Sequence, residues 1–154
     1  MVKIFKFSII FLLLNFTPAL SKIIKPSIKI KPAQVIKIQL KGLMKNDTPY
    51  IDQGIEQTWE FAHPSNQRFT GPLNRFKEMI KGESYNMLLN HISHEVMEIY
   101  RDESRALYEV TVLDSNKKYF KFRWQVEKFL DKGPLKNCWL TTLVSQPIPL
   151  GSST

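Results

Sequence analysis

The fold is decided by residues 46–80, which read NDTPYIDQGIEQTWEFAHPSNQRFTGPLNRFKEMI. Two runs with apolar residues at helical spacing lie on either side of a cluster of turn-forming residues. The first run predicts an amphipathic helix over residues 51–62. Asp52 stands where an N-terminal cap is expected, and Glu56 is positioned as its capping partner.

The second half of the stretch predicts a turn and another helix. His63-Pro64 ends the first helix, because the residue before a proline is disfavoured in the helical conformation. Residues 65–72 are rich in Ser, Asn, Gly and Pro and predict a loop. Apolar residues at helical spacing from Leu73 to Ile80 then predict a helix that ends at Gly82.

The turn residues and apolar positions combine into a longer pattern. It comprises Asn46-Asp47-x-Pro49, Asp52-x-Gly54-Ile55-Glu56, Trp59-x-Phe61-Ala62-x-Pro64-x-Asn66, Thr70-Gly71-Pro72-Leu73-x-Arg75-Phe76, Met79-Ile80 and the later Cys138-Trp139. This pattern resembles the domain-of-unknown-function family 4864, in the form found in photosynthetic eukaryotes. The resemblance runs over about residues 32–144. It implies a cone fold like that of nuclear transport factor 2 and the cystatins, and it brings no catalytic residues.

The first 21 residues have the pattern of a secretory signal peptide. Lys3 and Lys6 precede an apolar run of about ten residues, and Ala19 and Ser21 offer small side chains to a signal peptidase. Secretion is therefore the expected localisation. The alternatives are an uncleaved membrane anchor, or a plastid address in which residues 22–31 act as a short transit segment.

The net charge of +8 is concentrated near the N-terminus. From Asp47 onward, 13 Lys and Arg face 14 Asp and Glu, whereas residues 22–45 contain no acid. The basic residues there are Lys22, Lys25, Lys29, Lys31, Lys37, Lys41 and Lys45. Residues 22–31 predict an extended linker, and Pro32 begins a helix with a solvated lysine face. Contact of this arm with a membrane surface is an alternative, while the lack of Arg and aromatic residues disfavours nucleic acid.

The second half of the chain changes to a period of two, which is typical of strands. Strands are expected at residues 96–100, 106–113, 120–127 and 138–144, joined by turns at 114–117 and 131–134. Helices followed by antiparallel strands define an α+β class, with the N-terminal helices packed on a curved sheet. The domain is expected to span residues 32–146, and residues 147–154 a flexible tail.

A curved sheet facing helices predicts either a filled core or an apolar pocket. The candidate pocket residues are the large aromatic side chains Trp59, Phe76, Phe120, Phe122, Trp124 and Trp139. Asp52, Glu56 and His63 are candidates for the pocket mouth, where one of them could act as a general acid or base.

Other reactive residues predict little chemistry. His91, His94 and Glu95 do not have the spacing of a helical zinc motif, so we expect no metal site and no cofactor. Cys138 is the single cysteine, which excludes an internal disulfide and predicts a buried thiol. Asn46-Asp47-Thr48 matches the glycosylation acceptor pattern.

The sequence therefore predicts a non-enzymatic extracytoplasmic binding or interaction domain, which holds either a small apolar ligand in a pocket or a partner protein on the outer sheet face. One alternative is a small pocket enzyme that uses an Asp/His pair. Another is an assembly subunit that docks a protein on the outer sheet face, and this protein could be a second copy of the chain in a homodimer. Polar side chains at alternate positions of the third strand would form that face: Lys121, Arg123, Gln125 and Glu127.

Overall fold

The computed structural model describes residues 22–154, so the predicted signal peptide lies outside the described residues. The helices are α1 (Pro32–Met44), α2 (Gln53–Glu60), α3 (Pro64–Thr70) and α4 (Leu73–Lys81), followed by the short 3-10 turn η1 (Asn86–Leu88). The strands are β1 (Ser93–Arg101), β2 (Arg105–Leu113), β3 (Lys118–Lys128), β4 (Trp139–Val144) and β5 (Ile148–Ser152).

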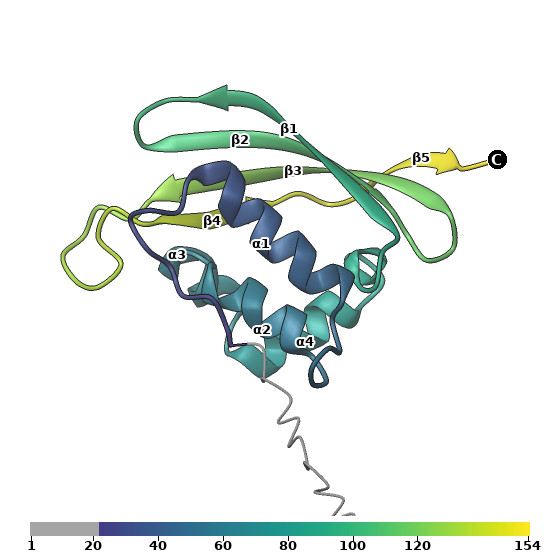
Figure 1. Cartoon of the computed structure of the whole chain (residues 1–154), viewed down its shortest axis with the longest axis horizontal. Helices are drawn as coiled ribbons and strands as arrows, with labels where there is room; N and C mark the ends of the chain where they lie inside the picture. Colours follow the sequence, from purple (N-terminus) through teal and green to yellow (C-terminus); the bar gives the residue numbers. More distant parts are fainter. Residues whose placement is uncertain (1–21) are drawn as a thin grey trace, which may run out of the picture.

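The predicted α+β class is confirmed. The helices precede one five-stranded antiparallel sheet and cover one of its faces, and α1 lies nearest to the strands (Figure 1). The strand order is β1-β2-β3-β4, and β5 also pairs with β3. The two last strands thus share one long partner, with β4 on the second half of β3 and β5 on the first half.

The end of the chain differs from the prediction of a flexible tail at residues 147–154. Ile148–Ser152 forms β5 and pairs with β3 from Lys118 to Lys121. A register shift at Phe120 accommodates Pro149, which has no backbone N–H to donate. Backbone hydrogen bonding to β3 therefore orders a segment whose exposed side chains contribute little packing.

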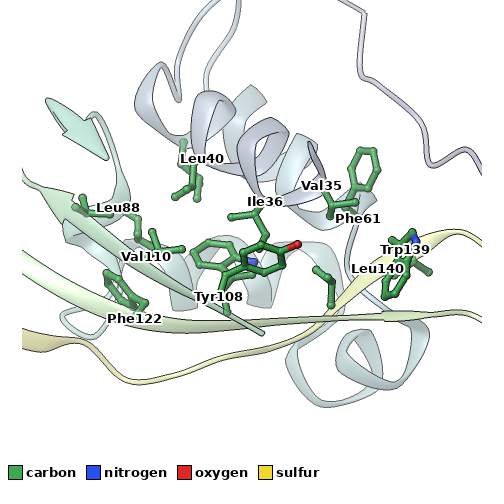
Figure 2. Close-up of a cluster of buried hydrophobic side chains, with 14 of the residues drawn as sticks. Val35, Ile36, Leu40, Phe61, Leu88, Tyr108, Val110, Phe122, Trp139 and Leu140 are labelled. Atoms are coloured by element: carbon green, nitrogen blue, oxygen red, sulfur yellow. The ribbon is translucent and has the colours of Figure 1, made fainter. Parts of the chain in front are cut away.

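The core lies between α1 and the inner face of the sheet. Val35, Ile36 and Leu40 of α1 point toward Tyr108 and Val110 of β2 (Figure 2). Alternate residues of β2 and β3 are buried, as the period of two predicted. The buried set on these strands comprises Ala106, Tyr108, Val110, Val112, Phe122, Trp124 and Val126. The outward positions of β3 hold Lys121, Arg123, Gln125 and Glu127, and Lys121 forms an ion pair with Glu109 at 3.0 Å.

Helices α1 and α2 contact each other through two glycines. A Cβ atom added to Gly54 would overlap the carbonyl oxygen of Gly42 and lie 2.9 Å from the Cα of Asn46. A Cβ added to Gly42 would come no closer than 3.3 Å to any atom across the contact. The sequence pattern suggested a turn role for Gly54, but its role is to let the two backbones approach.

The start of α2 also corrects an expectation. Asp52 precedes the helix in a left-handed conformation, with φ of 66°, and its side chain does not cap α2. Asn46 does so from a distance: its Oδ1 accepts a hydrogen bond from the N–H of Ile55 at 3.0 Å, and its backbone oxygen accepts one from Gly54 at 2.9 Å. Two of the N–H groups left free at a helix start are satisfied in this way.

Helix α3 occupies part of the predicted loop at residues 65–72. The first helix ends before His63-Pro64, as predicted, because α2 stops at Glu60. Pro64 also begins α3, where it occupies the first turn and its missing N–H costs nothing. His63 is the cap, because its Nδ1 accepts a hydrogen bond from the N–H of Ser65 at 3.0 Å. The chain before the cap is held to the sheet by a hydrogen bond from the N–H of Thr141 to the carbonyl oxygen of Phe61, at 2.7 Å.

Candidate functional site

A cavity of about 90 Å³ lies between the four helices and the strands β3 and β4. Apolar side chains form most of its wall, among them Leu43, Phe76, Ile80 and Leu88. The other lining residues are Gln39, Thr58, Ala62, Asn66, Thr70, Met79, Tyr85, Trp124, Thr141 and Val144. The space between helices and sheet is therefore neither completely filled nor large.

A buried hydrogen-bond cluster forms the polar part of the wall. The Oε1 atom of Gln39 accepts hydrogen bonds from Thr141 Oγ1 at 2.7 Å and from Trp124 Nε1 at 3.1 Å. The Nε2 atom of Gln39 donates to the carbonyl oxygen of Thr58 at 3.0 Å. The cluster joins α1 to α2, β3 and β4, and it fixes the indole of Trp124 at the cavity.

The remaining polar groups of the wall are neutral. Tyr85 donates its hydroxyl to the carbonyl oxygen of Val144 at 3.2 Å, and burial raises the pKa of that phenol. Asn66 and Thr70 hydrogen-bond to backbone carbonyl groups. Among the described residues, the lining contains no Asp, Glu, His, Lys, Arg or Cys. The cavity therefore offers hydrogen bonding but no group that exchanges a proton near neutral pH.

Two of the six predicted pocket aromatics, Phe76 and Trp124, line the cavity. Trp59 instead packs its ring 5.0 Å from that of Phe76 and against Gly71, where a Cβ atom would lie 2.6 Å from the indole. The other three aromatics pack elsewhere. Phe120 faces Pro149 across the β3–β5 pair, Phe122 is buried beside Tyr85, and Trp139 lies under the ammonium group of Lys128.

Asp52 and Glu56 do not lie at the mouth of the cavity, contrary to the prediction. Asp52 Oδ2 lies 2.8 Å from Lys81 Nζ, and Glu56 Oε1 lies 2.7 Å from Lys77 Nζ, so both carboxylates tie α2 to α4. Burial opposes the ionisation of Asp52, but hydrogen bonds from Lys81 and Asn46 outweigh it and lower its pKa. The hydrogen bond from Lys77 lowers the pKa of Glu56 despite partial burial.

The histidines are placed in two separate environments. His63 packs 5.4 Å from the ring of Phe129, outside the cavity wall, and burial lowers its pKa. His91 is buried, and its Nε2 lies 2.7 Å from His94 Nδ1. Within residues 22–154, no group of three His, Cys, Asp or Glu side chains is arranged to hold a metal ion.

Two further sequence features have clear places in the structure. Cys138 is buried, and burial raises the pKa of its thiol. The side-chain amide of Asn46 is also buried and donates to Asp47 Oδ1 at 2.9 Å and to Asp52 Oδ1 at 3.3 Å. A glycan would replace one of the two hydrogens on this nitrogen and break at least one of these hydrogen bonds, and the buried site leaves no room for a sugar, so glycosylation of Asn46 is incompatible with the folded arrangement.

Sequence reasoning missed the polar part of the wall, which includes Gln39, Thr58, Asn66 and Thr141. Gln39 carries the one available signal, because it is a polar residue within the apolar stripe of α1. Thr141 carries none, because threonine is common in strands irrespective of its hydrogen bonds.

Comparison with known proteins gave no matching family model, no matching curated sequence and no matching solved structure. In the described part of the chain, no helix is both long and apolar enough to cross a membrane.

Proposed function

We propose that this protein is a non-enzymatic binding domain that holds a small, neutral, mostly apolar ligand in the cavity beside Trp124. The observation that carries the proposal is an apolar wall interrupted by one preorganised cluster, that of Gln39 and Thr141. Such a combination is typical of ligand sites, where few polar groups orient a largely apolar molecule.

The size of the cavity limits the ligand to a few heavy atoms. A cavity of about 150 Å³ lined by Leu, Ile and Phe holds benzene, and the space here is about 90 Å³. The absence of charged side chains from the described lining favours a neutral ligand, because a buried ion without a partner loses its hydration without compensation.

Ligand-observed NMR with small neutral probes that are smaller than benzene, such as 2-propanol and acetone, tests this proposal. Ala62 lies in the wall and is 4% exposed, so Ala62→Leu places three extra carbon atoms in the cavity and should abolish binding. Ala33→Leu is the matched control, because Ala33 is partly buried but does not line the cavity. Absence of binding to the unaltered protein, or equal binding by the Ala62 variant, would refute the proposal.

The acid–base alternative receives less support. A general acid in an apolar pocket requires a raised carboxyl pKa, whereas the pKa values of Asp52 and Glu56 are lowered by Lys81 and Lys77. Both carboxylates also lie outside the lining of the cavity. A binding function therefore needs no reactive group, whereas acid–base catalysis would require Asp52 or Glu56 to move into the cavity.

Self-association is a second candidate, favoured by the apolar outer face of β1. Met97 and Tyr100 are 58% and 45% exposed, and they stand opposite Glu109 and Leu107 of β2 on the outer side of the sheet. A second copy would cover these side chains. Sedimentation equilibrium of the protein and of Met97→Glu tests this candidate, since a dimer formed there should dissociate in the variant.

Secretion is also part of the proposal, supported by the apolar run that follows Lys3 and Lys6 and by the small residues at positions 19 and 21. N-terminal sequencing of the protein from its native cells is the test. A chain that begins at Lys22 supports secretion with cleavage, and a chain that begins at Met1 contradicts cleavage.

A further inference from the structure

A second hollow lies on the opposite side of α1 and α2 from the sheet-facing cavity, and the two share no lining residue. It is a groove of about 660 Å³, bounded by the arm at residues 22–30, by α1, by the turn at Thr48 and Pro49, and by α2. This volume falls within the range of about 300–1,000 Å³ that is usual for ligand sites. Ile24, Ile30 and Ile38 supply its apolar surface.

One wall of the groove carries a row of cations. Lys37 and Lys41 of α1 and Lys45, which directly follows the helix, recur every fourth residue, so successive residues are about 6 Å apart along the helix axis. Lys22 adds a fourth cation from the arm. All four are exposed, none forms an ion pair with another described residue, and no described Asp or Glu lines the groove. The groove is therefore positively charged and complementary to an anionic ligand.

The groove already contains one example of peptide recognition, made by Gln57 of α2. The side-chain Oε1 of Gln57 accepts a hydrogen bond from the N–H of Ile24 at 2.8 Å, and its Nε2 donates to the carbonyl oxygen of Ile24 at 2.9 Å. A single carboxamide thus satisfies both backbone groups of one residue in an extended segment. This pairing holds the arm of residues 22–31, predicted as an extended linker, against the helices.

Gln53 presents the same group one helical turn earlier. The residue is 6% exposed overall, and its side chain lines the groove without a hydrogen bond to any residue of the described chain. Because no buried side-chain nitrogen or oxygen of the described residues lacks a partner, the carboxamide atoms of Gln53 reach the open space of the groove. They are therefore free to pair with a ligand there.

We propose that this groove binds an extended, acidic segment of a partner polypeptide. The carboxamide of Gln53 pairs with the N–H and carbonyl of one partner residue, as Gln57 does with Ile24. Side chains on one side of an extended chain recur at about 6.6 Å, which matches the spacing of about 6 Å between Lys41 and Lys45. Acids at alternate positions therefore meet successive lysines, while the residues between them face Ile24 and Ile38.

The shape of the site favours a peptide over a membrane surface. A bilayer is flat on this scale and would contact the exposed lysine tips without reaching Gln53, whose side chain lines the inside of the groove. An extended peptide enters the groove and reaches both. A contact with Gln53 therefore distinguishes a bound peptide from a membrane surface.

Fluorescence anisotropy of labelled peptides with the full chain tests the proposal. The probe is a peptide of about six residues that alternates Glu with Val or Ala, long enough at about 3.3 Å per residue to pass Lys37, Lys41 and Lys45. The comparison probe has Lys in place of Glu. Vesicles of phosphatidylcholine with phosphatidylserine are assayed by co-sedimentation.

We expect the acidic peptide to bind and the basic peptide not to bind. Lys41→Gln combined with Lys45→Gln should weaken binding about tenfold and reduce its sensitivity to salt. Gln53→Met should weaken it by about tenfold without changing the salt sensitivity. Lys132→Gln, which removes an exposed lysine in the loop between β3 and β4, should leave the affinity unchanged.

Three results would overturn the proposal. The first is equal binding of the acidic and basic peptides. The second is an unchanged affinity in the variant that carries both lysine substitutions. Lys41 and Lys45 are exposed, so this variant should fold normally even if substitution of Gln53 disturbs the fold. The third is binding to phosphatidylserine vesicles without binding to the acidic peptide, which would make the lysine row a membrane-contacting surface.

Discussion

The contact between Gly42 and Gly54 leads to a sharp prediction about stability. Gly54→Ala adds a single methyl group, whose carbon would overlap the carbonyl oxygen of Gly42 and lie 2.5 Å from the carbonyl carbon. Both atoms belong to the backbone of α1, so no side chain can rotate away and the helices must separate. Overpacking of a core by one methyl group typically costs about 1–3 kcal/mol.

The magnitude follows from three contributions. Alanine favours a helix over glycine by about 1 kcal/mol, which opposes the loss. Separation of α1 from α2 also strains the hydrogen bonds that Asn46 makes to Gly54 and Ile55, each contributing about 1 kcal/mol. We expect the free energy of unfolding to fall by about 3 kcal/mol in total, at the upper end of the overpacking range.

Urea unfolding, followed through the fluorescence of the buried Trp124, measures this loss. With a slope of about 1–3 kcal/mol per molar urea, the midpoint should fall by about 1–3 M. Gly42→Ala is the matched control on the facing helix, because its new Cβ would lie 3.3 Å from its nearest neighbours. Its unfolding free energy should change by less than about 1 kcal/mol. A loss in Gly54→Ala no larger than that in Gly42→Ala would refute the role of this contact.

Three further predictions concern buried polar and ionised groups. Asn46→Ala should lower the free energy of unfolding by about 2 kcal/mol in urea, because α2 loses its remote cap and buried groups lose partners. Since the pKa values of Asp52 and Glu56 are lowered in the folded state, their stabilisation is complete above the ordinary values of 3.8 and 4.5 and is lost as the pH falls below them. Acid titration of stability should show this loss, and Lys81→Met should reduce its slope; an unchanged slope would contradict the ion pair as its cause. The Cys138 thiol, buried and with a raised pKa, should react with a disulfide reagent rapidly in urea and slowly in buffer, whereas rapid reaction in buffer would show that it is accessible.

The sequence was sufficient for elements whose apolar pattern persists over several turns or residue pairs. The helix at Pro32–Met44 and the strand at Lys118–Lys128 are examples, because one face of each must be buried whatever the details of the packing. The alternation of β3 also predicted correctly that Phe122 and Trp124 face inward and that Arg123 faces outward.

The errors arose where the decisive partner is distant in sequence. β5 is ordered by backbone hydrogen bonds to β3, about 30 residues earlier, and Pro149 and Gly151 argue locally against a strand. Asp52 and Glu56 have local patterns of capping residues, but Lys81 and Lys77 on α4 determine what they do. A short helix such as α3 has too few residues for its periodicity to outweigh a proline.

The candidate site was predicted only in outline. Periodicity indicated which residues face the interior, but it does not indicate which of them meet at a gap in the packing. Phe76 and Trp124 from the predicted set line the cavity, whereas Gln39 and Thr141 form a pair 102 residues apart that no local pattern reveals. The groove beside the arm depends similarly on Gln57 reaching back to Ile24.

The hydrogen bonds of Gln39 bear on how α1 finds a unique position along the sheet. The apolar stripe of this helix repeats about every four residues, at Ile36, Leu40 and Met44, so a slide by one turn would still bring aliphatic side chains against the strands. Such a slide would leave Thr141 Oγ1 without its acceptor, Trp124 Nε1 with only its bond to Thr141 at 3.4 Å, and the carbonyl oxygen of Thr58 without the Gln39 amide. With each orphaned buried group costing about 1–3 kcal/mol, the shifted arrangement lies several kcal/mol higher. Gln39 thus fixes the register of α1 on the sheet, because the apolar face of the helix alone could pack in more than one register.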